Sequence, residues 1–192
     1  MSQVVYGCLM SVDRDQVLRR AAAQLTRKGS STMDEVARAA RISRATLHRH
    51  FAGRDALIRA LEELGIQECE AAMDAARLGE DSAQDALRRL IKEIEPAAGL
   101  LAFLVTENQL FEGDAQHEGW ARLDVRIAEL FRRGQESGEF RIDLSAAWLT
   151  EALYGLVGSG AWAVLDGRVA AKDISYMIAE LLIGGAQRRV ES

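Results

Sequence analysis

Proline, cysteine and histidine are scarce in this sequence. Its 192 residues include one proline, Pro96, two cysteines and three histidines. The cysteines, Cys8 and Cys69, lie far apart, and neither has a second ligand at the spacing of a zinc site. With so few histidines, most metal-based and acid/base mechanisms lack the side chains they need. We therefore expect no disulfide framework, no metal and no cofactor.

Long apolar runs are also missing. No stretch approaches the roughly 18 residues that a membrane-spanning helix needs. The opening residues, MSQVVYGCLM, carry no basic residue ahead of their short apolar part and make a poor secretory signal. We therefore expect a cytoplasmic protein with no membrane partner. Because Met10 could itself serve as a start, residues 1–9 are interpreted as a dispensable extension, with a short ordered arm as the alternative.

Helix-forming residues are abundant. The chain is 48% hydrophobic and 28% charged, and its runs rich in Ala, Leu, Glu and Arg contain few clusters of β-branched residues. This composition predicts an all-α fold, and the chain is long enough for one good core or two small ones.

Charge is distributed unevenly along the chain. Residues 11–60 hold eleven Lys or Arg and five Asp or Glu, whereas residues 61–192 hold thirteen and twenty-four. A basic first part joined to an acidic remainder is expected if only the first part approaches a polyanion such as DNA. A solvated helix surface can show the same asymmetry, so the charge pattern alone does not establish that the first part binds a polyanion.

Three helices are predicted in the basic part, and the second and third of them are short. Apolar residues at helical spacing indicate a helix over residues 12–28. Thr32, with Glu35 three residues later, forms a capping box that opens a second helix. Ser43 is a natural N-cap for a third helix that ends near His50. Two short helices joined by a tight turn are a helix-turn-helix candidate.

The third predicted helix, SRATLHRHF at residues 43–51, has one apolar face. Leu47 and Phe51 are four residues apart, so their side must pack on the first two helices. Ala45 and Arg49 then point away from the core, which is the geometry of a helix that reads base edges in the major groove. A short, solvated surface helix is the alternative interpretation.

Residues 31–61, STMDEVARAARISRATLHRHFAGRDALIRAL, resemble the amino-terminal DNA-binding domain of the TetR family of transcriptional regulators. A later stretch, GQESGEF at residues 134–140, is also similar to one that closes a helix in that family. The chain departs from the family pattern where Arg41 replaces a turn glycine, where His48 and His50 replace tyrosines, and where Arg54 replaces lysine. The positions that match include Thr32, Ala37, Ala40, Ser43, Thr46, Leu47 and Phe51.

The resemblance implies a double-stranded DNA operator as partner and assigns two kinds of contact. Arg41 must either take a left-handed backbone or alter the turn. For His48, direct base contact and neutral packing are both open. The residues that would read bases are Arg44, Ala45, His48 and Arg49, and those that would hold the DNA backbone are Thr32, Thr46, His50 and Arg54, the last together with its helix's N-terminal amides.

The rest of the chain is also predicted to be helical. We divide the whole chain into a helix-turn-helix domain at residues 10–55 and a larger ligand-binding and dimerisation domain at residues 56–192, joined by a linking helix. The resemblance implies a cavity for a small apolar or amphipathic ligand among the helices spanning residues 82–165. If Glu107 and Glu151 are both buried, they would suit a cationic or hydrogen-bonding ligand. The candidate wall residues, each of which could instead be ordinary core, are Phe103, Glu107, Phe111, Trp120, Leu123, Trp148, Glu151 and Tyr154.

The last two helical segments, residues 144–165 and 172–186, are apolar on more than one face. A helix with two apolar faces needs two packing partners. Glycines inside such a helix reduce its stability, unless they allow another backbone to pack closely and so compensate for the loss. We therefore expect a homodimer with a four-helix interface. Its candidate residues are Gly155, Gly158, Ser159, Trp162 and Tyr176.

Signatures of catalysis are absent from the sequence, which has no phosphate-binding glycine loop and no catalytic triad pattern. The best enzyme-like group is Glu107, Asp114, His117 and Glu118, and a solvated loop is the better interpretation of it. The sequence favours a TetR-like repressor that a small apolar ligand releases from a palindromic operator. The alternative is a helical small-molecule-binding or enzymatic bundle whose amino-terminal module does not bind DNA.

Overall fold

The computed structural model of the protein describes residues 14–107 and 118–187. Within these ranges the regular structure is helical, apart from one isolated antiparallel bridge between Phe140 and Gln187. The predicted all-α fold is confirmed. None of the helices in the described ranges combines the length and apolar character needed to cross a membrane. The predicted extension at residues 1–9 lies outside the described residues.

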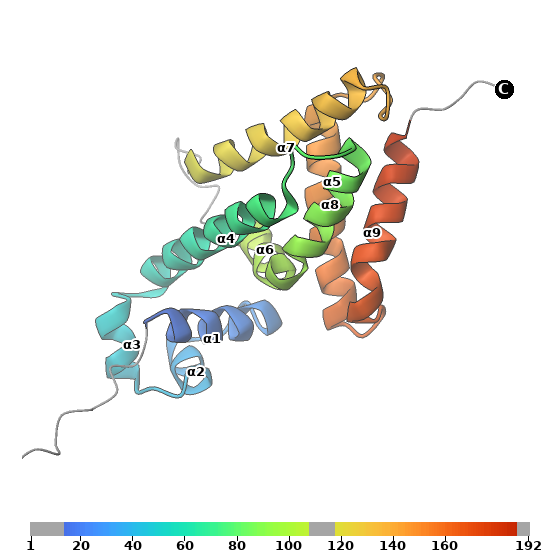
Figure 1. Ribbon diagram of the computed structural model, residues 1–192. Helices are drawn as coiled ribbons and strands as arrows, with labels where there is room; N and C mark the ends of the chain where they lie inside the picture. The colour runs from blue at the N-terminus through green and yellow to red at the C-terminus, as the bar shows by residue number, and fades with distance from the viewer. Residues whose placement is uncertain (1–13, 108–117, 188–192) are drawn as a thin grey trace, which may run out of the picture. The chain divides into compact units, whose positions relative to one another are not determined.

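The helices form two compact units, which divide between Leu61 and Glu62, inside the fourth helix. The predicted boundary, after residue 55, falls earlier on that same helix. In chain order (Figure 1) the helices are α1 (Arg14–Arg27), α2 (Met33–Ala39), α3 (Arg44–His50), α4 (Arg54–Ala76), α5 (Ala83–Ile94), the 3-10 helix η1 (Glu95–Ala97), α6 (Ala98–Thr106), α7 (Glu118–Glu136), α8 (Ala146–Leu165) and α9 (Ala171–Ala186).

In the first unit, both short helices begin at the predicted caps. The Thr32 hydroxyl accepts a hydrogen bond from the Glu35 N–H at 3.3 Å, and the Glu35 carboxylate accepts one from the Thr32 N–H at 2.8 Å. The Ser43 hydroxyl accepts from the Thr46 N–H at 3.0 Å. Each cap satisfies a backbone donor that the helix leaves unpaired and contributes about 1 kcal/mol. These helices are too short to be stable without such caps and tertiary packing.

The second unit packs its helices around a continuous apolar core. α8 contacts α6, α7 and α9, and α5 contacts α7 and α9; Figure 1 shows α8 and α9 running side by side. Gly160 permits this approach, because a Cβ added there would lie 3.0 Å from the Ile174 side chain. The second unit's part of α4 contributes buried Ile66, Cys69 and Met73 to the core.

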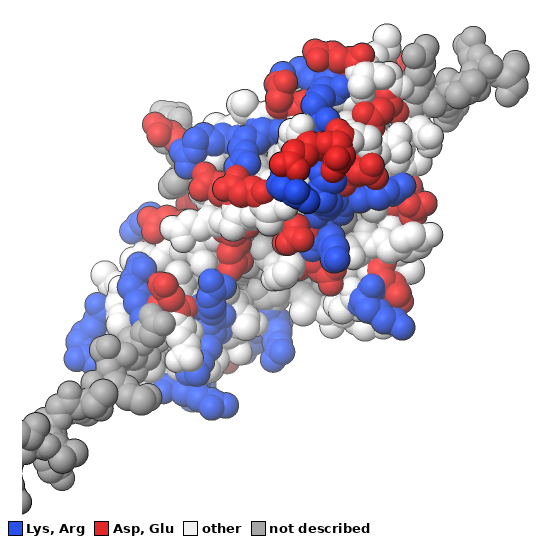
Figure 2. Space-filling model, in the orientation of Figure 1, with Lys and Arg blue, Asp and Glu red and all other residues white. Residues whose placement is uncertain are grey.

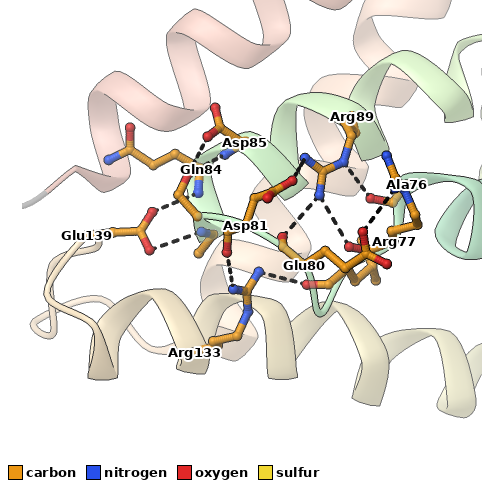
Figure 3. Close-up of polar contacts among 12 residues, drawn as sticks. Ala76, Arg77, Glu80, Asp81, Gln84, Asp85, Arg89, Arg133 and Glu139 are labelled. Atoms are coloured by element: carbon orange, nitrogen blue, oxygen red, sulfur yellow. Dashed lines mark hydrogen bonds and ion pairs between the residues drawn. The ribbon is translucent and has the colours of Figure 1, made fainter.

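Two arginines hold the turn that joins α4 to α5 (Figure 3). Arg89 donates from Nε to the Ala76 carbonyl at 2.8 Å, which satisfies an unpaired acceptor at the end of α4. Arg133 of α7 donates to the carbonyls of Leu78 and Asp81, both at 2.7 Å. These bonds secure a turn in which Asp81 has a left-handed backbone, with φ 55°.

The stretch GQESGEF supplies a cap for α5. The Glu139 carboxylate accepts hydrogen bonds from the N–H groups of Ala83 and Gln84, both at 3.0 Å (Figure 3). Burial raises the pKa of Glu139, but these two hydrogen bonds, a third from Ser137 and the charge of Arg133 together outweigh it and leave the pKa below its ordinary value. The carboxylate is therefore ionised at neutral pH, and it lies at the positive end of the helix dipole.

Candidate nucleic-acid interface

The orientation predicted for α3 is confirmed. Leu47 is 0% exposed and Phe51 is 2% exposed, whereas Ala45 and Arg49 are on the exposed side. The guanidinium carbon of Arg14, in α1, lies 5.2 Å from the centre of the Phe51 ring. α3 is thus fixed by its apolar face, and a cation–π contact supports its end. Among the described residues, the opposite face of α3 is exposed to solvent.

The turn between α2 and α3 adopts the left-handed geometry, with Arg41 at φ 59°. The Arg41 N–H donates to the Arg38 carbonyl and the Ile42 N–H to the Ala37 carbonyl, both at 3.0 Å. This is the Schellman pattern that ends many helices, and glycine usually occupies its left-handed position. The choice left open by the sequence is therefore settled, since the backbone keeps the turn and Arg41 bears the strain.

We expect Arg41→Gly to stabilise the first unit by about 0.5–1 kcal/mol. Glycine removes the steric cost of a left-handed side-chain-bearing residue, and part of the gain is lost to its greater freedom in the unfolded chain. Amide hydrogen exchange in α2 and α3 would measure the change. Arg38→Gly is the matched control, because Arg38 lies inside α2 and its replacement should destabilise the helix. Equal destabilisation by both changes would contradict this account.

The four candidate base-reading residues, Arg44, Ala45, His48 and Arg49, are all exposed. Arg44 forms an ion pair with Asp34 of α2 at 3.2 Å, and the Arg49 Nη2 donates to the Thr46 hydroxyl at 3.1 Å. Exposed pairs of this kind contribute at most about 1 kcal/mol. Both guanidinium groups can therefore exchange these partners for DNA at small cost.

The four candidate backbone-binding residues have structural roles in this fold. Thr32 caps α2, and the Thr46 hydroxyl lies 2.9 Å from the Ser43 hydroxyl. The His50 ring lies beside the Phe51 ring, with centroids 6.2 Å apart. Arg54 donates to the carbonyls of Ser31 at 3.1 Å and Gly29 at 2.8 Å, which ties the start of α4 to the turn between α1 and α2. Their contacts with phosphate stay predictions.

Electrostatics favour an anionic partner for the first unit. In Figure 2, Lys and Arg predominate over this unit on the face shown, and both signs are mixed over the second unit. The first unit's Glu35 accepts a hydrogen bond from Lys28 at 2.7 Å. This bond and that from the Thr32 N–H lower the pKa of Glu35 to about 2. The Glu35 carboxylate of the capping box therefore becomes protonated only as the pH falls from about 4.5 towards 2.

The candidate ligand-wall residues differ widely in exposure. Trp148 is 61% exposed and Glu151 is also exposed, so the condition under which Glu151 would favour a cationic ligand is not met. Glu107 is half-buried at the end of α6. Phe111 lies outside the described residues. Of the others, Phe103 and Leu123 are buried core residues, and Trp120 and Tyr154 are half-buried.

Trp120 and Tyr154 each bond to an acid that the sequence reasoning missed. The Trp120 Nε1 donates to Glu62 at 2.9 Å, and the Tyr154 hydroxyl donates to Asp124 at 2.8 Å. Burial, followed by the bond to Asp124, raises the pKa of Tyr154, so the phenol stays protonated. Glu62 is only 8% exposed. Its place four residues before Ile66, on the buried stripe of α4, was the signal available in the sequence.

The five candidate dimer residues all retain some exposure. Gly155, Ser159 and Tyr176 are exposed, and Gly158 and Trp162 are half-buried. A Cβ added at Gly155 or Gly158 would meet nothing within 4 Å. These glycines therefore make no close approach inside this chain. Large apolar neighbours on α8 and α9 are exposed as well, namely Trp148, Met177 and Leu181.

The described residues contain no group of three or more potential metal ligands. In the enzyme-like cluster suggested by the sequence, Asp114 and His117 lie outside those residues, and Glu118 is the first residue of α7. Cys69 is buried and unpaired. Burial raises the pKa of its thiol to about 12, so the reactive thiolate is not formed at neutral pH.

Comparison with known proteins agrees with this geometry. Residues 17–61 match the family model described as bacterial regulatory proteins, tetR family. The HTH-type transcriptional regulator NfxB of Pseudomonas aeruginosa is 32% identical over 180 residues, which cover 93% of this chain and 96% of NfxB.

Solved structures share the fold at lower identity. The TetR-like regulator LfrR of Mycobacterium smegmatis, in complex with proflavine, is 23% identical with a TM-score of 0.75, over 93% of this chain and 98% of LfrR. PfmR of Thermus thermophilus, a TetR family regulator, is 22% identical with a TM-score of 0.70, over 90% of this chain and 99% of PfmR. From the sequence match and the geometry of its first unit, this chain belongs to the TetR family of bacterial transcriptional regulators, and α2 and α3 form its DNA-binding helix-turn-helix.

Proposed function

We propose that this protein is a repressor that binds a palindromic DNA operator as a homodimer and leaves it when a small apolar or amphipathic ligand occupies the second unit. The observation that carries the proposal is the exposed face of α3. There Arg44, His48 and Arg49 surround the small Ala45, while buried Leu47 fixes the helix from behind. Arginine at such a position recognises guanine through two hydrogen bonds, and a small neighbour permits close approach to the groove.

The exposed apolar face of α8 and α9 supports the proposed homodimer. Trp148, Tyr176 and Leu181 are 61%, 68% and 65% exposed, which is unusual for large apolar side chains grouped on adjacent helices. Gly155 and Gly158 leave room for a second backbone to approach. A two-fold interface would bury this face and place two α3 helices for two related half-sites.

We expect Tyr176→Glu to weaken the homodimer at least tenfold, because it places an unpaired charge in the proposed interface. Sedimentation equilibrium would measure the dissociation constant. Ile142→Glu is the matched control, since Ile142 is 83% exposed and lies outside α8 and α9. A dimer unaffected by Tyr176→Glu, or equally affected by both changes, would place the interface elsewhere.

The ligand class is supported by the interior of the second unit and by one relative. LfrR was solved with proflavine, a molecule with a flat aromatic body and polar ends. In this chain the half-buried Trp120 and Tyr154 place indole and phenol groups beside the acids Glu62 and Asp124. Coupling to DNA would pass along α4, which contributes to both units, so that a tilt of this helix changes the spacing of the two α3 helices.

A gel-shift assay with the DNA upstream of the protein's own gene tests the proposed function. We expect a retarded complex at low salt that weakens steeply as salt rises, because phosphate contacts release counterions. Scrambling one half of the palindrome should abolish the specific complex and leave only salt-sensitive, non-specific binding. No complex at low salt would favour the alternative, a helical bundle whose first unit does not bind DNA.

A further inference from the structure

The second unit contains a half-open cavity of about 160 Å³ that none of the predicted ligand-wall residues lines. It lies where the end of α5, η1 and the start of α6 face the second half of α8 and the first half of α9. Small side chains create the space, because Ala98, Gly99, Ala161 and Ala171 stand where larger residues would fill it. The remaining lining residues are Ile91, Ile94, Glu95, Val157, Val164, Ile174, Ser175 and Ile178.

Two polar side chains interrupt the apolar wall. Glu95, in η1, is half-buried and is the one charged residue among the described lining residues. Its carboxylate has no ion-pair or hydrogen-bond partner in the described part of the chain. The hydroxyl of Ser175, in α9, likewise has no side-chain hydrogen bond there. The wall therefore offers one negative charge and one hydroxyl, both with free acceptor capacity.

The size of the cavity limits its occupant. An engineered apolar cavity of about 150 Å³ in another protein holds one benzene molecule. A single ring or a short alkyl chain therefore matches the volume of about 160 Å³, whereas a three-ring dye does not. The apolar lining would bury such a group, and Glu95 with Ser175 would accept hydrogen bonds from a cationic end.

We propose that this cavity is a second ligand site, which takes a small primary amine with one aromatic ring or a short alkyl chain. Its ammonium group would donate to the Glu95 carboxylate and the Ser175 hydroxyl, while the ring or chain lies against Ile94, Val157 and Ile178. The site is distinct from the predicted wall residues of the second unit. The proposal of this site does not depend on whether the first unit binds the proposed operator.

Benzylamine is the probe, and an NMR titration of the full-length protein is the measurement. We expect saturable shifts at the amides of residues that line the cavity, with weaker binding of neutral benzyl alcohol and none of anionic phenylacetate. Glu95→Gln should weaken benzylamine about three- to fivefold, as for a partly exposed charge pair, without changing benzyl alcohol. Glu93→Gln is the matched control, because Glu93 is exposed on α5 and does not line the cavity.

A second variant tests whether the cavity itself is occupied, independently of the charge of Glu95. Ala171→Leu adds a large side chain at the exposed rim of the cavity, where it should not disturb the core, and should abolish binding of both benzylamine and benzyl alcohol. Benzylamine that shifts no lining residue would overturn the proposal and indicate that another part of the protein, or a second copy of the chain, covers the cavity. Unchanged affinity in Glu95→Gln would overturn the assignment of an amine.

Discussion

Arg49→Ala should raise the Kd for the operator by roughly 5- to 150-fold, or about 1–3 kcal/mol, while leaving affinity for random DNA almost unchanged. Arg49 lies on the exposed side of α3, opposite buried Leu47 and Phe51. Within the described part of the chain, its side-chain hydrogen bond goes to the Thr46 hydroxyl, on the same helix, at 3.1 Å. The guanidinium can therefore leave this partner and form two bonds to a guanine at little cost.

Fluorescence anisotropy with operator and scrambled duplexes, at one fixed salt concentration, would measure this difference. Arg168→Ala removes the same charge from the turn between α8 and α9, where the exposed Arg168 pairs with Asp166 at 3.0 Å. That control corrects for net charge and should leave both affinities unchanged. An equal loss on operator and scrambled DNA for Arg49→Ala would show that Arg49 binds phosphate and reads no base.

Local signals in the sequence were sufficient to predict the first unit. Thr32 and Ser43 act as caps because short polar side chains satisfy backbone donors within three residues, which depends on nothing distant. The spacing of Leu47 and Phe51 fixed the orientation of α3 for the same reason. Even the Arg41 turn was narrowed to two possibilities, and the structure selects the left-handed one.

Contacts between distant segments could not be predicted in this way. Arg54 bonds to Gly29 and Ser31, more than twenty residues earlier, and Glu62 bonds to Trp120, fifty-eight residues later. Helical periodicity says which residues share a face but not which other helix covers it. The periodicity therefore gave no sign that Trp148 is 61% exposed, or that a cavity lies beside Glu95.

Gly134→Ala should destabilise the second unit by about 3 kcal/mol. Gly134 is buried in α7, where a Cβ would overlap the ring of Phe140 and lie 2.9 Å from the Ala83 Cβ. Phe140 is 0% exposed, its ring centroid lies 5.7 Å from that of Phe131, and its N–H donates to the Gly134 carbonyl at 2.9 Å. The ring therefore cannot retreat, and overpacking outweighs the gain of about 1 kcal/mol that alanine brings to a helix.

Urea unfolding followed by tryptophan fluorescence would measure this loss selectively, because all three tryptophans belong to the second unit. Gly79→Ala is the matched control, since a Cβ there meets nothing within 4 Å, and it should change stability by less than about 0.5 kcal/mol. Phe140→Leu should reduce the cost of Gly134→Ala, giving a coupling of about 1 kcal/mol or more. Strictly additive losses would contradict the steric account. Non-additive losses would mean that glycine is required at position 134 because the buried ring of Phe140 occupies the space that a side chain there would need.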